Sequence, residues 1–365
     1  MQALRALAAL YVVLYHSQVP LFFWSTEADA AWMSFQKRGF MGVDIFFVIS
    51  GFIMAWVCVF SGRSSDGTIG FLVKRIFRVA PPYWLATLLA VFILGRINTS
   101  DELFASLAFI PLSKDGPPFY GTPVLFVGWS LVYEMSFYLI FAVALLFGRY
   151  SIIVAIFALV TLVFAIPLLF DADLTFSAYR LIDIKSSYLS ALTNPMMMEF
   201  AIGMMVAWIY SKIHGKVNKL HALVVFFVGV ITMAVIMATY ADGHNALKLG
   251  VPAGLLLLGV ILAEDVGLLK VPKFAVWLGD ISFAIYLIHP VVIGLVNEHM
   301  PAPAAIGAFY GKVLFVIGAV VVISHHWYRL IEVPFQKMGS RLAKHGLIFE
   351  GVLMKNNSDL ASRTI

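Results

Sequence analysis

The chain is built largely from apolar runs about 20 residues long, and this pattern is the strongest constraint on its fold. Of its 365 residues, 61% are hydrophobic and only 12% are charged. A soluble domain is nearer half apolar and a quarter charged. An α-helix needs roughly 20 mostly apolar residues to cross a bilayer. The sequence therefore predicts an all-α transmembrane bundle.

About ten membrane spans are predicted, in a single domain of residues 1–345 followed by a polar tail, 346–365. The segment 102–112 is apolar but short, which fits a re-entrant or interfacial helix. The segments 24–39, 96–123 and 171–193 are predicted to be connecting loops. The spans lie near residues 3–23, 41–61, 77–95, 124–147, 151–170, 194–211, 220–240, 246–263, 274–297 and 304–328.

The distribution of basic residues predicts the orientation of the bundle. With a cytoplasmic N-terminus, most of the 25 Lys and Arg fall on the cytoplasmic side of the spans. Because cytoplasmic loops carry an excess of Lys and Arg, this predicts an N-in, C-in topology and an even number of spans. The excess of Lys and Arg on the cytoplasmic side also accounts for the net charge of +5. The sequence shows no basic soluble face of the kind that binds nucleic acid. Cys58 has no cysteine partner for a disulfide or a metal site.

Arg5 and His16 share one face of the first predicted span. At about 100° and 1.5 Å per residue, they lie roughly 20° apart around the helix and about 16 Å apart along it. The face presents a cation at the cytoplasmic surface and an imidazole about two-thirds of the way along the helix, deep in the membrane. Ionisable groups inside spans are costly and are therefore functional candidates. The simpler alternatives are a positive-inside anchor at Arg5 and a structural histidine at His16.

Asp44 opens the second predicted span, at about the depth of His16. A carboxylate there could hold one imidazole tautomer and stabilise its protonated form. The alternative is an aspartate that caps a helix start.

The fourth and ninth predicted spans also carry polar side chains. Ser130 and Glu134, which follow Trp129, are four residues apart and share a helix face. A glutamate in mid-membrane needs a partner, and an Arg or His elsewhere in the bundle is the expected one. The ninth span carries Tyr286 and His289, the latter near mid-membrane beside Pro290, where a structural histidine at a kink is the alternative.

Arg75 and Arg78 are predicted at the cytoplasmic entrance of the third span. Two arginines three residues apart form one positive face, which suits a phosphate or pyrophosphate. An ordinary positive-inside cluster is the alternative. The chain has no Walker-type loop, no GxGxxG, no His/Cys metal spacing and no GxSxG, which disfavours ATP coupling, a metal centre and a conventional serine hydrolase.

Taken together, these segments resemble the acyltransferase-3 family of integral membrane O-acyltransferases. The resemblance runs from Leu4 to about Pro334, and the first motifs are most similar to the exopolysaccharide-production branch. No esterase-like domain follows the bundle, so a standalone form is expected. The motifs are Leu4-Arg5-Ala6 with His16, Gly42-Val43-Asp44 through Phe52, Arg75-Ile76-Phe77-Arg78 with Pro81-Pro82-Tyr83-Trp84, Trp129-Ser130-Leu131 with Glu134, Ser282 through Pro290, and Glu332-Val333-Pro334.

The resemblance implies that an acyl group, usually acetyl, passes from cytoplasmic acyl-CoA to a hydroxyl of a glycan or glycolipid outside the cytoplasmic membrane of a bacterium. Arg5 and His16 match the family's essential pair, and Arg75 and Arg78 match its cytoplasmic arginine motif. An imidazole there can act as a general base or can take the acyl group covalently. Asp44 and Glu134 would be supporting groups, and Trp129, Ser130, Tyr286 and His289 polar groups near the substrate.

Two other functions use the same residues differently. A transporter or flippase for a glycan precursor would use the intramembrane His, Asp and Glu as a proton relay. A structural scaffold of a polysaccharide synthesis complex would tolerate His16→Ala without loss of glycan acylation.

Overall fold

A computed structural model of the chain describes residues 1–17, 27–61, 67–95, 99–113, 115–300, 303 and 305–344. Within these residues the protein is helical, and its one extended pairing is an isolated bridge between Ser177 and Asn245. The predicted all-α class is confirmed for this part of the chain. The predicted tail, 346–365, lies outside the described residues.

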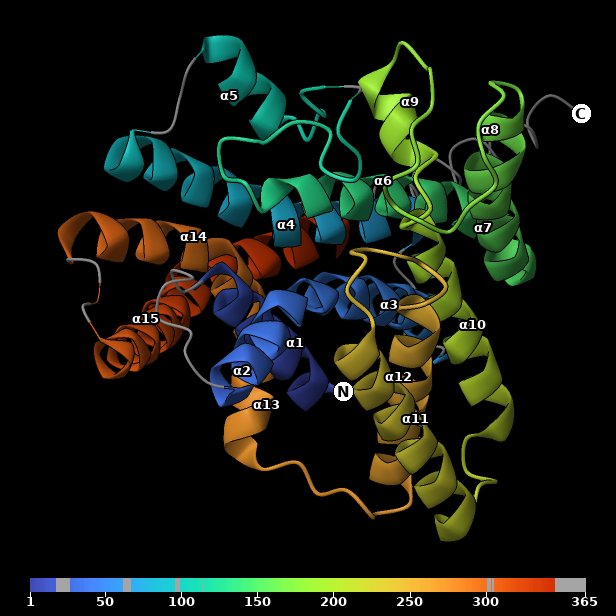
Figure 1. The fold of residues 1–365 in the computed structure, drawn as a ribbon. Helices are drawn as coiled ribbons and strands as arrows, with labels where there is room; N and C mark the ends of the chain where they lie inside the picture. Colours follow the sequence, from blue (N-terminus) through green and yellow to red (C-terminus); the bar gives the residue numbers. More distant parts are fainter. Residues whose placement is uncertain are drawn as a thin grey trace, which may run out of the picture.

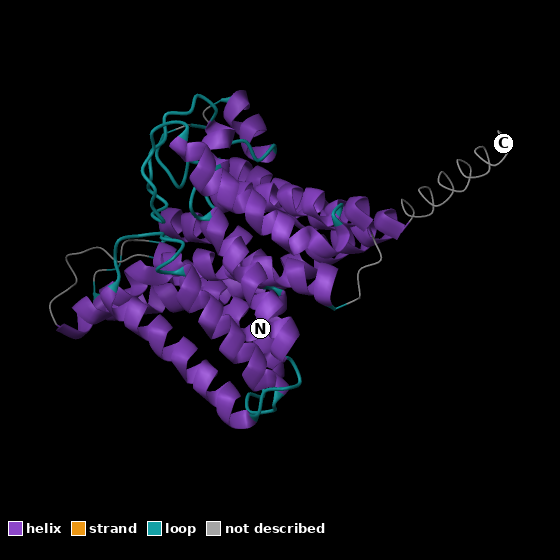
Figure 2. Ribbon diagram, turned by 90° about the vertical axis from the view of Figure 1, so that its right-hand side faces the viewer, coloured by secondary structure: helices purple, strands orange, loops and turns teal. Residues whose placement is uncertain are grey.

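The helices pack as a single bundle (Figure 1). In Figure 2 many of the connecting loops gather at the left side of the helices. The helices are α1 (Gln2–His16), α2 (Glu27–Lys37), α3 (Met41–Ala55), α4 (Gly67–Leu94), α5 (Ser100–Leu107), α6 (Gly128–Leu145), α7 (Ser151–Val160), α8 (Ile166–Leu168), α9 (Ser187–Leu192), α10 (Met197–Ile213), α11 (Lys219–Thr239), α12 (Gly250–Asp265), α13 (Lys273–Asp280), α14 (Ser282–His299) and α15 (Ile306–Trp327).

Seven of the described helical segments are long and apolar enough to cross a bilayer, and the bent α13–α14 pair adds an eighth. Helices α1 and α12 have 15 and 16 residues, which is short for a span of about 20 residues. Helix α1 ends at His16, and positions 18–23 of the predicted first span lie outside the described residues. The count of about ten spans and the N-in, C-in topology therefore stay predictions.

The predicted loop 24–39 is wrong over its described part. Helix α2 continues through a 3₁₀ turn into α3, so that one helical segment runs from Ala31 to Phe60. The polar residues of α2 suggested a loop, but Ala, Met, Gln and Lys all favour helix and no proline interrupts them. The first part of the segment 102–112 belongs to the short helix α5, which ends at Leu107. The Trp84 indole of α4 donates a hydrogen bond to the Leu107 carbonyl.

Helix α4 begins ten residues before the predicted start at 77, so Arg75 and Arg78 lie in its third and fourth turns and not at its N-terminal end. Pro81 and Pro82 are inside the helix and both are buried. Prolines are tolerated in membrane helices because neighbouring groups satisfy the freed backbone. The charges suggested a helix boundary, but the arginines line a cavity between helices. Their cytoplasmic position stays a prediction.

The predicted ninth span, 274–297, is two helices. Helices α13 and α14 meet at an angle of 64° at Ile281. Pro290 lies within α14, nine residues beyond the bend. Helix α13 lies against α1, and the Gln2 amide donates a hydrogen bond of 2.5 Å to Asp280 Oδ1.

Helix α3 is the centre of the bundle and contacts α1, α10 and α12. Its packing against α10 is backbone to backbone. A Cβ atom at Gly203 would lie 2.0 Å from the Val48 carbonyl oxygen, and one at Gly51 would lie 2.1 Å from the Phe200 carbonyl oxygen. Small residues at such contacts let membrane helices approach closely.

We expect Gly203→Val to destabilise the bundle, because the added side chain has no space against α3. Overpacking of this kind costs about 1–3 kcal/mol, and more against rigid backbone. Thermal unfolding in detergent micelles should give a Tm several degrees below that of the unchanged protein. Gly318→Val is the control, because no described atom lies within 4 Å of that Cβ position. Equal Tm values for the two variants would contradict the packing argument.

Candidate active site

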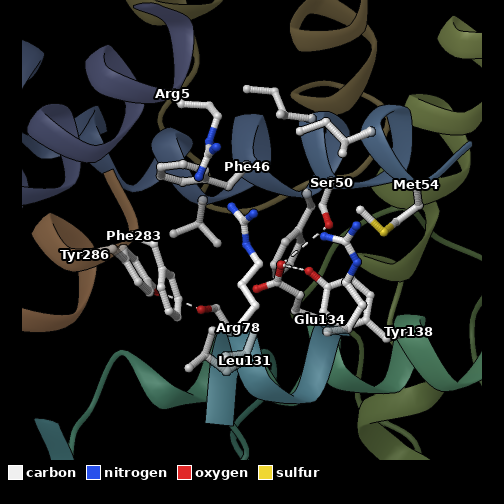
Figure 3. Close-up of a pocket in the computed structure, with 17 residues that line it drawn as sticks. Arg5, Phe46, Ser50, Met54, Arg78, Leu131, Glu134, Tyr138, Phe283 and Tyr286 are labelled. Atoms are coloured by element: carbon white, nitrogen blue, oxygen red, sulfur yellow. Dashed lines mark hydrogen bonds between the residues drawn. The ribbon is translucent and has the colours of Figure 1, made fainter. Parts of the chain in front are cut away.

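A cavity of about 110 Å³ lies among α1, α3, α4, α6 and α14. Six predicted site residues line it, and they come from four helices that are far apart in the sequence. Apolar side chains that include Phe46, Met54 and Phe283 form the rest of the wall (Figure 3). The six are Arg5, Arg75, Arg78, Ser130, Glu134 and Tyr286.

Three guanidinium groups dominate the charge of this cavity. Arg5 reaches in from α1 and Arg78 from α4, and Figure 3 shows their side chains extending toward each other. The Arg75 guanidinium lies 5.6 Å from the Phe71 ring centre and 5.9 Å from that of Tyr138. The ion pairs among the described residues lie elsewhere. The arginines therefore keep donors for a ligand that carries negative charge.

Two carboxylates lie close to this cluster. Glu134 lines the cavity, and Glu332 is buried, with one oxygen that has no hydrogen-bond partner. Glu332 interacts electrostatically with Arg5 and Arg78, and Glu134 does so with Arg5 and Arg75. With every group ionised, the cluster carries one excess positive charge.

Hydroxyl groups are the hydrogen-bond partners of Glu134. Tyr138 donates a short hydrogen bond to its Oε1, and Ser50 Oγ lies 3.5 Å from the same oxygen. The prediction of an Arg or His partner is thus met only at longer range, by the electrostatic contact with the arginines. Two hydroxyl donors keep this carboxylate fixed at the cavity wall.

Ser130 and Tyr286 close one end of the cavity. Their hydroxyl oxygens lie 2.6 Å apart, and each hydroxyl is also within hydrogen-bonding distance of the Val127 carbonyl. Tyr286 is three residues before His289 on α14, and the centres of their rings are 5.9 Å apart. The imidazole of His289 therefore lies next to the Ser130–Tyr286 pair.

His289 and His16 form a direct pair. His289 Nε2 lies 3.1 Å from His16 Nδ1, and the rings are stacked with their centres 5.0 Å apart. His289 is fully buried. The sequence placed each histidine in a separate predicted span, and neither spacing nor residue type indicated that they meet.

The backbone around the pair fixes the tautomers. His289 Nδ1 lies 3.2 Å from the Ile285 carbonyl oxygen, and His16 Nδ1 lies 3.0 Å from the Val12 carbonyl oxygen. A carbonyl oxygen only accepts, so each Nδ1 carries a proton. His289 Nε2 is then an acceptor for the His16 Nδ1 proton. In this tautomer His16 Nε2 carries a lone pair, and a general base accepts a proton through such a nitrogen.

His16 lines a second cavity of about 240 Å³. It is formed by the end of α1 with α14 and α15, and it shares no lining residue with the first cavity. Arg5 and His16 thus face two different cavities from one helix. His16 is the last residue of α1, so its predicted position two-thirds of the way along this helix is wrong.

The predicted pairing of Asp44 with His16 is also wrong. Asp44 Oδ2 lies 2.9 Å from His244 Nδ1, and both side chains are almost fully buried. His16 has His289 as its side-chain partner. Asp44 lies near the start of α3 as predicted, but its side chain points to the loop between α11 and α12. Glu199 of α10 interacts with Asp44 and is fully buried.

Trp129 belongs to the same region as His244 and lines neither cavity. The Trp129 ring centre lies 5.5 Å from that of His244 and 4.9 Å from that of Phe119. Sequence reasoning missed His244 because it is a single residue in a connecting loop, 200 positions from Asp44. No motif or spacing marks it.

A family model described as an acyltransferase domain (acyltransferase 3) matches residues 1–325. The chain therefore belongs to the acyltransferase-3 family, as the motifs indicated. The exopolysaccharide production protein ExoZ of Rhizobium meliloti is 31% identical over 315 residues, which cover 82% of this chain and 90% of ExoZ.

Two further relatives carry acyl-transfer names. The peptidoglycan O-acetyltransferase OatA of Listeria monocytogenes is 24% identical over 362 residues, or 92% of this chain and 55% of OatA, so the chain spans about half the length of that relative. The acyltransferase MdmB of Streptomyces mycarofaciens is 28% identical over 149 residues, which cover 38% of this chain and 36% of MdmB. No solved structure matches the chain.

We expect Asp44 and His244 to be energetically coupled. Removal of one partner leaves a buried polar group unsatisfied, so Asp44→Ala and His244→Ala should each cost about 1–3 kcal/mol of unfolding free energy. The double variant should cost clearly less than the sum of the two single changes. Chemical unfolding of the four proteins in mixed micelles measures this coupling.

The control is the same cycle with Asp44→Ala and His16→Ala. These two changes should be additive within about 0.5 kcal/mol. Coupling of Asp44 to His16 in place of His244 would contradict the observed pairing.

Proposed function

We propose that the chain is a membrane O-acyltransferase that moves an acyl group, with acetyl the best fit, from acyl-CoA to a hydroxyl of a glycan or glycolipid. The observation that carries this proposal is the line of side-chain contacts from the arginine cavity through Ser130, Tyr286 and His289 to His16. Membership of the acyltransferase-3 family and the acyl-transfer names of the relatives support it.

The arginine cavity suits the donor. CoA carries several phosphate charges, and guanidinium groups bind phosphate oxygens in pairs with good geometry. Arg5, Arg75 and Arg78 supply such donors in one cavity, and the excess positive charge of the cluster favours an anion. The apolar side chains of the same cavity suit the uncharged remainder of the donor.

His16 suits the acceptor. In the proposed reaction, the acyl end of the donor extends from the arginine cavity past Ser130 and Tyr286 to His16, while the donor phosphates stay at the arginines. The acceptor hydroxyl then gives its proton to His16 Nε2 while its oxygen attacks the thioester carbonyl carbon. The tetrahedral adduct collapses, the C–S bond breaks, and the imidazolium returns the proton to the departing CoA sulfur. His289 Nε2 accepts a hydrogen bond from the His16 Nδ1–H group and thereby holds the His16 ring in the reactive tautomer.

The topology of the proposal follows from α1. Arg5 lies in its first turn and His16 at its last residue, so these two residues lie about 16 Å apart along the helix axis. We infer that the arginine cavity faces the cytoplasm, since the positive-inside bias favours a cytoplasmic N-terminus. The acceptor then meets His16 toward the outer side of the bacterial cytoplasmic membrane.

If the arginines bind the donor phosphates, replacing two of them should weaken acyl-CoA binding and spare the fold. Arg75→Gln/Arg78→Gln removes two charge-assisted contacts of about 1.5–3 kcal/mol each. We expect the Kd for acetyl-CoA to rise at least a hundredfold in a calorimetric titration of the purified protein. The Tm should change little.

Arg149→Gln is the matched control, because Arg149 is exposed and stacks on Tyr150 with its guanidinium 4.7 Å from the ring centre. Its Kd for acetyl-CoA should equal that of the unchanged protein. An unaltered Kd in the Arg75/Arg78 variant would remove the donor assignment.

If His16 is the general base, His16→Ala should lower kcat for acyl transfer by about 10²–10⁴. The Kd for acetyl-CoA should stay the same, since His16 does not line the arginine cavity. Transfer from radiolabelled acetyl-CoA to an oligosaccharide measures kcat. His289→Leu should lower kcat less, because it removes only the group that positions His16.

Two results would redirect this proposal. A labelled histidine adduct on the protein, formed without acceptor and consumed when acceptor is added, would make His16 a covalent carrier of the acyl group. Glycan movement across a vesicle membrane without any acylation would instead favour the transporter.

A further inference from the structure

Lys312 is a cation that the donor cavity and the histidine pair do not use. It lies in the second turn of α15 and lines the second cavity together with His16. A lysine inside a predicted span is costly unless it is solvated or paired, so it marks a functional position by default. Because Lys312 lines the same cavity as His16, its charge can act on a ligand that is bound beside this histidine.

The lining of the second cavity combines polar and apolar residues. His16, Ser17, Asn297 and Lys312 supply the polar groups, and the rest of the lining is apolar. Among the residues that the structure describes, no acidic side chain lines the cavity. Lys312 is half-buried and makes no ion pair within the described part of the chain.

The neighbours of Lys312 explain why its charge is available. Lys312 has only apolar neighbours on its own helix within the cavity, Phe309, Val313 and Val316. An unpaired ammonium group on an apolar helix face needs an anion or water, and an anion gains more where solvent is partly excluded.

We propose that the second cavity is the acceptor site and that Lys312 selects an acceptor with an anionic group, a carboxylate or a phosphate, close to the hydroxyl that is acylated. This inference rests on the proposed function and names its acceptor class. The sugar presents its hydroxyl to His16 Nε2 while its negative charge meets the Lys312 ammonium group. Asn297, exposed on α14, offers an amide to a neighbouring hydroxyl.

The two sources of the anion have different tests. A sugar acid places a carboxylate on the sugar itself, and a lipid-linked glycan places a phosphate at its reducing end. We would assay acyl transfer in phosphatidylcholine nanodiscs with cellotetraose, with a tetrasaccharide that carries one glucuronate, and with a prenyl-pyrophosphate-linked sugar. The protein should prefer one of the charged acceptors, by at least tenfold in KM, over the neutral one.

Lys312→Met keeps most of the length of the unbranched side chain and removes its charge. We expect it to raise KM for the preferred charged acceptor at least tenfold, to leave KM for cellotetraose unchanged, and to leave kcat almost unchanged. Lys312→Arg should restore most of the preference, because it restores the charge. Lys248→Met, outside the cavity, is the matched control and should behave like the unchanged protein.

Direct binding of the charged acceptors without acetyl-CoA separates this inference from the proposed function. The proposed function fails if no acceptor is acylated, whereas the Lys312 assignment fails if Lys312→Met binds both charged acceptors as tightly as the unchanged protein does. An equal rise in KM for neutral and charged acceptors would also overturn the assignment. Loss with the glucuronate acceptor alone identifies a carboxylate, and loss with the pyrophosphate acceptor alone identifies a phosphate.

Discussion

The close packing of α3 against α1 and α10 is the constraint on which the site depends. In a low-dielectric bundle every buried polar group needs a partner, and fixed helix positions decide which partners meet. The approach of α3 and α10 at Gly51 and Gly203 sets the position of Ser50 beside Glu134. The contact of α1 with α14 sets that of His16 beside His289.

The sequence predicted the residues of the site better than their pairings. Arg5, Arg75 and Arg78 could be grouped because they are basic residues on predicted helix faces, and all three line one cavity. The periodicity of one helix shows which residues share a face, but it does not show which residues of another helix contact that face. Asp44 was therefore assigned to His16, whereas its side chain pairs with His244, a loop residue 200 positions away.

Boundaries were predicted from polarity and failed where polar residues have an internal environment. The charges of Arg75 and Arg78 suggested the start of a helix, but a cavity accommodates them within α4. The polar face of α2 likewise suggested a loop. In both places the helix is longer than its apolar run, because the bundle supplies polar surroundings that the bilayer does not. The break at Ile281 was missed for a related reason, since Pro290 was the expected position of a bend.

The separation of the two cavities has a consequence for the membrane itself. Ser130, Tyr286 and His289 are buried, and they fill the space between cavities that share no lining residue. A continuous aqueous path through such a bundle would leak protons and dissipate the ion gradients that the membrane maintains. The buried side chains between the two cavities keep the bilayer electrically sealed, so that the acyl end of the donor reaches the acceptor only when it displaces them.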